Sequence, residues 1–245
     1  MPEVFPKAPI TEALIGIRVK LPGNVSLLDL EKLHDRIRDE YPDKKTRTMW
    51  EGTFEMRNEK DPLQKAQFQI DGYAFTSPDG RQVVQYRLDG FTFSRLRPYT
   101  RWEDVSAEAR RLWGIYMTET NPLLVTRLAV RYINSIEIPS KTFNYDDYFT
   151  AAPRIPPPLP QDLAHFFTRL VIPFPDRGAI AIITETPLEK HDPINTVIIL
   201  DIDVSKEVNL DPGDEKVYEI LSILREIKNE IFFSSITEKT KELFR

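Results

Sequence analysis

The order of the predicted elements is the feature that most constrains this chain, because a similar order occurs twice. A strand with alternating apolar residues, among them Ile15, Ile17 and Val19, lies between Pro9 and Pro22. The elements that follow are a helix, three strands and a long amphipathic helix, predicted at residues 26–41, 47–56, 66–76, 82–96 and 99–121. Such a run of elements is typical of a mixed α+β chain.

The pattern begins again after Pro122. A strand from Leu123 to Ile138 leads through a short helical piece into a proline-rich connector at residues 151–160, which is predicted to be extended and semi-rigid. Residues 161–167 are expected to add one or two helical turns. The remaining elements are three strands at 168–174, 179–187 and 195–204, a long helix from about residue 212, and a short helix at 237–244.

Both halves are therefore predicted as β-α-β-β-β-α repeats, residues 1–121 and 122–245, packed as one compact unit. Hairpin connections such as the turn from Ser77 to Gly80 favour mainly antiparallel pairing. The long helices must bury their apolar stripes on one face of a curved sheet. At the level of the fold, this α+β organisation resembles TATA-binding-protein-like or helix-grip-like proteins, a comparison that implies no function.

The composition excludes several kinds of chemistry. The chain has no cysteine, three histidines without ligand spacing, and 9 glycines against 20 prolines. Disulfides, thiolate nucleophiles and zinc–thiolate sites are thereby excluded, and the common motifs of phosphate loops and serine hydrolases are absent. The net charge of −5 provides no whole-molecule basic field for nucleic acid. Because the sequence contains no signal peptide or membrane span, we expect a cytoplasmic protein without membrane contact.

Several segments carry a resemblance to one known family. They are the opening run 9–13, the segments 89–99 and 127–134, the Trp-Glu pair at 102–103, the Leu-Asp-Ile-Asp run at 200–203 and the segment 228–237. Together they resemble a sporadically distributed family of prokaryotic proteins that has no established activity. The resemblance covers nearly the whole chain, and it brings no catalytic residues to carry over.

Basic and aromatic side chains are interleaved in two of the predicted segments. The candidate binding patch consists of Arg95, Arg97, Tyr99, Arg101, Trp102, Arg127 and Arg131. Arginine presents forked donors to phosphate or carboxylate and stacks on aromatic rings, so such a patch suits nucleotides or single-stranded nucleic acid. The alternative is a network of salt bridges with acids such as Asp89 and Asp201.

Asp201 and Asp203 form the candidate metal pair. Residues two apart on a strand point to the same face, so both carboxylates are predicted on the face away from the helices. There they would be placed to share one Mg²⁺ or one basic partner. The alternative is that this face of an antiparallel sheet is simply exposed to water.

Three functions remain open from the sequence. The leading hypothesis is a non-catalytic interaction module without a cofactor, a homodimer that recognises a protein or nucleic-acid partner through the open sheet face or the Arg/aromatic patch. Phe232 and Phe233 cannot both face one core, which makes one of them a candidate dimer contact. The alternatives are a Mg-dependent nucleotide or phosphoryl-handling enzyme using Asp201 and Asp203, and a carrier of a small apolar ligand.

Overall fold

A computed structural model describes residues 5–55, 63–151, 153–160, 163, 165–188 and 194–245. Its strands are β1 (Ile10–Lys20), β2 (Asp43–Glu55), β3 (Leu63–Thr76), β4 (Gln82–Arg87), β5 (Gly90–Leu96), β6 (Leu124–Ile138), β7 (Thr168–Phe174), β8 (Ala179–Pro187) and β9 (Thr196–Leu210). Its α-helices are α1 (Leu27–Lys32), α2 (Trp102–Thr120), α3 (Lys216–Ser235) and α4 (Glu238–Glu242), and its 3₁₀ turns are η1 (Leu33–Arg36), η2 (Tyr145–Asp147) and η3 (Pro175–Arg177).

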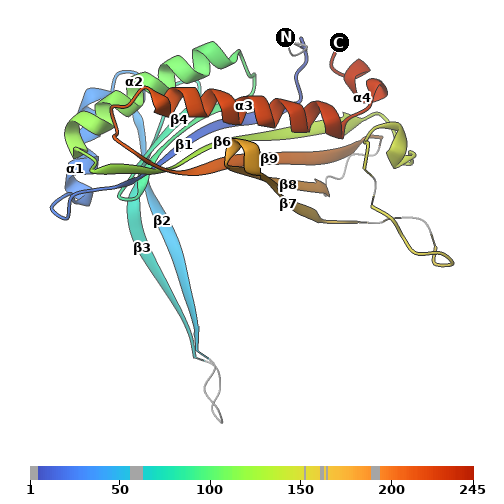
Figure 1. The fold of residues 1–245 in the computed structure, drawn as a ribbon, viewed down its shortest axis with the longest axis horizontal. Coiled ribbons are helices and arrows are strands. Elements are labelled where there is room, and N and C mark those ends of the chain that lie inside the picture. The colour runs from blue at the N-terminus through green and yellow to red at the C-terminus, as the bar shows by residue number, and fades with distance from the viewer. Residues whose placement is uncertain (1–4, 56–62, 152, 161–162, 164, 189–193) are drawn as a thin grey trace.

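The nine described strands form one antiparallel sheet in the order β2-β3-β4-β5-β1-β6-β9-β8-β7. Pairing of β1 with β6 joins the strands of the two halves at the centre. At one end, the β2–β3 pair extends away from the body of the sheet, and β7 forms the opposite edge (Figure 1). The predicted α+β class with mainly antiparallel pairing is thereby confirmed.

Helices α1, α2 and α3 lie on the same face of this sheet (Figure 1). Side chains alternate between the faces of a strand, and on β1 the buried positions are Ala13, Ile15, Ile17 and Val19. Helix α2 contributes a matching stripe at helical spacing: Val105, Ala109, Leu112, Trp113 and Tyr116 are all buried. Both apolar patterns are buried in the same core, which fixes the face of the sheet that the helices cover. We call the other side the helix-free face.

Aromatic side chains fill the core beneath α2. Trp113 and Tyr116 stack with ring centroids 5.4 Å apart, and Tyr116 also stacks on Tyr86 of β4 at 5.7 Å. The buried hydroxyls have acceptors, since Tyr86 donates to the carbonyl of Leu112 and Tyr116 to that of Arg87. The cluster therefore fixes α2 on the sheet without leaving these hydroxyl groups unsatisfied.

The predicted strand at 82–96 is wrong, because this segment forms two strands, β4 and β5, joined at Leu88 and Asp89. Gly90 starts β5 with φ +150°, and a Cβ built there would lie 2.2 Å from the carbonyl oxygen of Ile17. This glycine lets the chain turn back against β1, which a residue with a side chain would prevent. The dipeptide Asp89-Gly90 indicates a hairpin turn, which the alternating apolar pattern of 82–96 did not reveal.

The predicted element order also differs from the structure elsewhere. The expected helix at 26–41 is only α1 followed by the 3₁₀ turn η1, which place Leu30 and Leu33, respectively, in the core. Between β6 and β7 the described residues contain η2 but no α-helix. Of the turns expected at 161–167, residues 161, 162 and 164 lie outside the described part and the others are not helical. No described helix has the length and apolar character needed to span a membrane.

Two glycines test this account of the fold. We expect Gly90→Ala to lower the free energy of unfolding by about 2 kcal/mol or more, because backbone atoms of β1 cannot move away from the added Cβ. Gly114→Ala, in the middle of α2 with no atom within 4 Å of its Cβ position, should raise it by about 0.5–1 kcal/mol. Urea unfolding measures both, and equal effects of the two substitutions would contradict the close approach at Gly90.

Candidate functional site

The seven residues of the predicted Arg/aromatic patch are divided between the two faces of the sheet. Arg95 pairs opposite Ala13, whose side chain is buried under the helices, whereas Arg131 pairs opposite the next residue, Leu14. Because successive residues point to opposite faces, Arg95 belongs to the helix-covered face and Arg131 to the helix-free face. Arg127, four residues before Arg131 on β6, shares the helix-free face. The two groups therefore do not form one surface.

On the helix-free face, the arginines are paired with the predicted metal ligands. Arg131 donates from Nε at 2.9 Å and from Nη2 at 2.5 Å to the carboxylate of Asp201. Arg127 lies 3.8 Å from Asp203, and burial raises the pKa of Asp203 above its usual range. Among the described residues no group of three or more acidic, histidine or cysteine side chains is placed to hold a metal. Magnesium binding at this pair stays a prediction.

The remaining members of the patch have local partners. Arg97 donates to the carbonyl of Pro9 at 3.3 Å, and Arg101 pairs with Asp104 at 3.0 Å. The hydroxyl of Tyr99 lies 3.2 Å from that of Tyr132 on β6, and Trp102 is buried at the start of α2. This part of the predicted patch is therefore a junction between α2 and the sheet.

Helix α3 adds two basic residues to this junction that the predicted patch lacked. The guanidinium of Arg225 lies 5.5 Å from the centroid of the Trp102 ring, and the Lys228 ammonium lies 3.9 Å from that of Tyr132. Burial, followed by the charge of Arg225, lowers the pKa of Lys228 to about 7. Their spacing of three residues on an apolar helix face was the available sequence signal.

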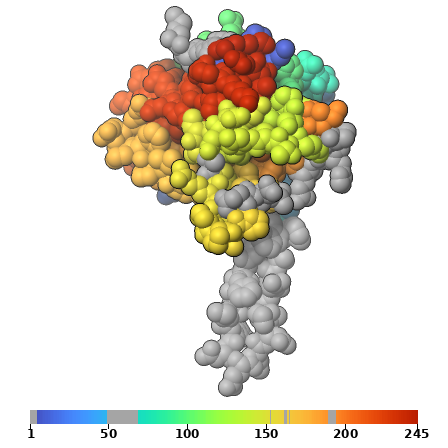
Figure 2. Space-filling model, turned by 90° about the vertical axis from the view of Figure 1, so that its right-hand side faces the viewer, coloured from blue at the N-terminus to red at the C-terminus, as the bar shows by residue number. Residues whose placement is uncertain are grey.

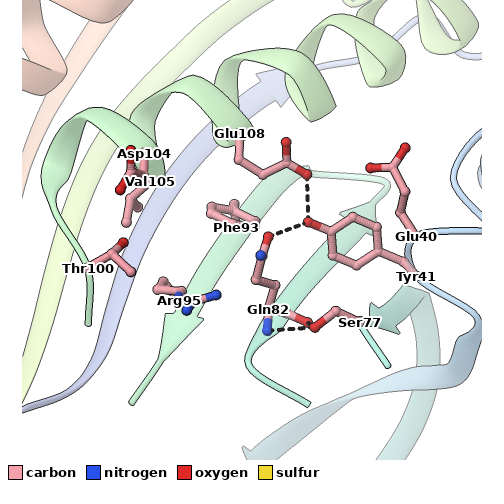
Figure 3. Close-up of a pocket in the computed structure, with 10 residues that line it drawn as sticks. All are labelled: Glu40, Tyr41, Ser77, Gln82, Phe93, Arg95, Thr100, Asp104, Val105 and Glu108. Atoms are coloured by element: carbon pink, nitrogen blue, oxygen red, sulfur yellow. Dashed lines mark hydrogen bonds between the residues drawn. The ribbon is translucent and has the colours of Figure 1, made fainter. Parts of the chain in front are cut away.

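A cleft of about 410 Å³ lies beside α2, where the helix starts above the ends of β4 and β5 (Figure 3). Most of the side chains that line it are polar: Glu40, Tyr41, Ser77, Gln82, Phe93, Arg95, Thr100, Asp104, Val105 and Glu108. The small-carrier alternative predicted an apolar lining, whereas this cleft carries four ionisable side chains and a tyrosine. We call it the Arg95 cleft.

A hydrogen-bonded network closes one side of the Arg95 cleft. The Tyr41 hydroxyl lies 2.7 Å from both Glu108 and Gln82 (Figure 3), and Arg111 binds Glu108 from outside the cleft. Both contacts are made to acceptors, the side-chain oxygen of Gln82 and the carboxylate of Glu108, which therefore share the single proton of the Tyr41 hydroxyl. Burial opposes the ionisation of Glu108, but hydrogen bonds from Arg111 and Tyr41 outweigh it and lower its pKa.

The β7 edge is the third notable feature. Within the described part of the chain, twelve large apolar residues are exposed, and eight of them fall between residues 159 and 194: Leu159, Leu163, Phe167, Leu170, Val171, Ile180, Leu188 and Ile194. Val171 is 60% exposed on the edge strand itself. Figure 2 shows the region of β7 and β8 (gold) at the molecular surface. Five of these eight residues lie on β7 and β8 or directly beside them, namely Phe167, Leu170, Val171, Ile180 and Leu188, so apolar exposure is enriched at this end of the sheet.

Comparison with known proteins adds no assignment to these three places. No protein-family model matches the sequence, and no curated protein matches it either. The resemblance to a prokaryotic family of unknown activity stays a prediction, and the functional interpretation depends on the geometry of the chain itself.

The buried Lys228 gives a test by pH. Its pKa of about 7 in the folded chain lies below the ordinary 10.5, so between these values the unfolded chain holds the extra proton. Stability is therefore expected to rise with pH through this window, while the cost of the buried charge is fully present below pH 7. We expect Lys228→Met to raise the free energy of unfolding at pH 6–7 by an amount on the order of 2–4 kcal/mol.

The control is Lys216→Met, at an exposed position of the same helix. Urea unfolding at pH 6, 7, 8 and 9.5 measures the difference from the wild type. The gain from Lys228→Met should shrink steadily towards pH 9.5, and a gain that is constant over the whole range would contradict the lowered pKa.

Proposed function

We propose that the protein is a non-catalytic interaction module that binds a protein partner by strand pairing along the open β7 edge, and that this partner is a second copy of the chain. The concentration of exposed apolar side chains at this edge is the observation that supports the proposal. An edge strand also presents unpaired backbone donors and acceptors. Backbone pairing and apolar contact would then act together.

A protein partner fits this edge better than nucleic acid does. Strand β7 has one charged residue, Arg169, among its seven. On the helix-free face, Arg127 and Arg131 are already neutralised by Asp203 and Asp201. Nucleic-acid binding needs several cations that can replace counterions on phosphates, and these groups do not supply them.

A second copy is favoured because antiparallel pairing of two identical edges closes on itself. Such a dimer is two-fold symmetric, and each partner covers the same apolar residues, Leu170 and Ile172 on one face and Val171 on the other. Pro173 lacks an N–H group and cannot donate to a partner strand, so the proposed pairing involves the residues of β7 that precede it. The alternative contact through Phe233 is weaker, because this ring is half-buried against Phe5.

We further propose that the two halves are structural repeats related to the TATA-binding-protein-like arrangement. The support is the strand order, which reads β1-β5-β4-β3-β2 in one direction from the centre and β6-β9-β8-β7 in the other. Each half then places a long helix, α2 or α3, directly after its last strand. The first half has one strand more than the second.

The edge is tested by Val171→Asp, which would place a carboxylate in the apolar contact and disrupt the dimer. Light scattering after size-exclusion chromatography is expected to give twice the 28.5 kDa chain mass for the wild type and the chain mass for the variant. Leu123→Asp is the control, because Leu123 is 58% exposed away from the edge, next to β6. A monomeric wild type, or a dimer that survives Val171→Asp, would overturn the proposal.

A further inference from the structure

We propose that the Arg95 cleft is a binding site for a carboxylate group. It is distinct from the β7 edge, since the cleft is built from β4, β5, α2 and the segment after η1 (Figure 3). The proposal does not depend on the proposed function. Arg95 provides the cation. It is available to a ligand because the acids of the cleft pair with Arg101 and Arg111.

Arg95 is the one charged lining residue that has no partner of its own among the described residues. No hydrogen bond or ion pair within 4 Å involves its guanidinium, and its Nε atom is buried without an acceptor. A buried donor without an acceptor is costly, and a charged one more so. An anionic ligand that bound the guanidinium would supply the missing compensation.

The acids of the cleft have their ion-pair partners outside it, and one arginine serves two of them. Arg111 pairs with both Glu40 and Glu108, and Arg101 pairs with Asp104. Asp79 is a further acid that interacts electrostatically with Arg95. Its pKa is lowered mainly by hydrogen bonds from Ser77 and the backbone N–H of Arg81, and only slightly by Arg95. The three acids Glu40, Asp104 and Glu108 thus balance Arg95, Arg101 and Arg111 in number, but none of them contacts the guanidinium of Arg95.

The N-terminus of α2 provides further hydrogen-bond donors near Arg95. Thr100, Asp104 and Val105 bring the first turn of the helix to the cleft. Arg101, at the N-cap, makes no side-chain cap hydrogen bond, so the first N–H groups of a 19-residue helix are not occupied by a capping side chain. The acids Glu103 and Asp104 in the first turn offset part of this positive charge, whereas the free N–H groups still offer donors to an anion on the same side as Arg95.

The single unpaired guanidinium favours a carboxylate over a phosphate. One guanidinium fork matches the two oxygens of a single carboxylate. A dianionic phosphate, or the chain of phosphates in nucleic acid, would bring more charge than Arg95 compensates and would face Glu40 and Glu108 across the cleft. The Gln82 side chain also lines the cleft, and its amide nitrogen is placed to contact the uncharged part of the ligand (Figure 3).

A carboxylate of this kind could belong to a small organic acid or to the free C-terminus of a peptide. The experiment therefore titrates the full chain, labelled with ¹⁵N, with acetate, with tetra-alanine, with tetra-alanine amide and with inorganic phosphate. The Nε–H resonance of the Arg95 side chain reports the site, and calorimetry gives each Kd. Acetate and free tetra-alanine are expected to shift this resonance, and tetra-alanine amide is not.

Arg95→Gln is expected to weaken carboxylate binding about 10- to 100-fold, because charge-assisted hydrogen bonds to the guanidinium are lost. Arg97→Gln, at the exposed neighbouring arginine, is the matched control and should leave Kd unchanged. If Arg95→Gln fails to fold, Arg95→Lys keeps the charge but loses the fork, and should bind more weakly than the wild type.

The outcomes separate the two ligand sources and the rival chemistry. Tighter binding of tetra-alanine than of acetate assigns the site to a peptide end, and the reverse order assigns it to a small acid. Binding of phosphate in preference to either carboxylate would overturn the proposal, as would carboxylate binding that Arg95→Gln leaves unchanged, or no shift of the Arg95 resonance at millimolar ligand. Because no residue of β7 lines the Arg95 cleft, these results do not depend on whether the β7 edge forms a dimer.

Discussion

The antiparallel pairing of β1 with β6 holds the strands of the two halves in one sheet. Strand β5 uses the other edge of β1, and β9 uses the other edge of β6, so each half extends outward from this pair. Its register also sets the faces, because Ile15 lies opposite Val130 and Ile17 opposite Leu128, all buried under the helices. A slip by one residue would turn these side chains outward. The β1–β6 register therefore determines both which side chains form the core and on which face the charged side chains lie.

Ion pairing determines which charges remain for function. Across β6 and β9, Arg131 and Asp201 satisfy each other, and pairing of Arg127 with Asp203 reduces the charge nearby. Beside α2, the opposite arrangement holds, since the acids have partners outside the cleft and Arg95 has none among the described residues. A basic residue therefore indicates a binding site only when the acids around it do not pair with it. The same physical rule leaves Arg127 and Arg131 paired on the helix-free face and leaves one guanidinium without a partner in the cleft.

Local patterns anticipated much of the fold, and non-local contacts explain the failures. Alternation and proline boundaries gave strands 168–174 and 179–187 with the bounds that the structure has. Alternation failed at 82–96, because a two-residue connection hardly interrupts the pattern, while the need for Gly90 arises from β1, some seventy residues earlier. The candidate site was harder. Arg95 could be selected as an arginine near aromatic residues, but its cleft also needs Glu40, Tyr41 and Glu108 from two other segments.

The sequence by itself determined the class of the protein and the inward face of its strands and long helices, because the periods of two and of 3.6 residues are local properties of the chain. It also placed Asp201 and Asp203 on a common strand face. The tertiary structure decided which charges meet, since Arg131 and Asp201 are seventy residues apart and become partners only in the register of β6 and β9. Only the tertiary structure shows that Arg95 and Arg131 lie on opposite faces of the sheet. They pair opposite Ala13 and Leu14, and successive residues of a strand point to opposite faces.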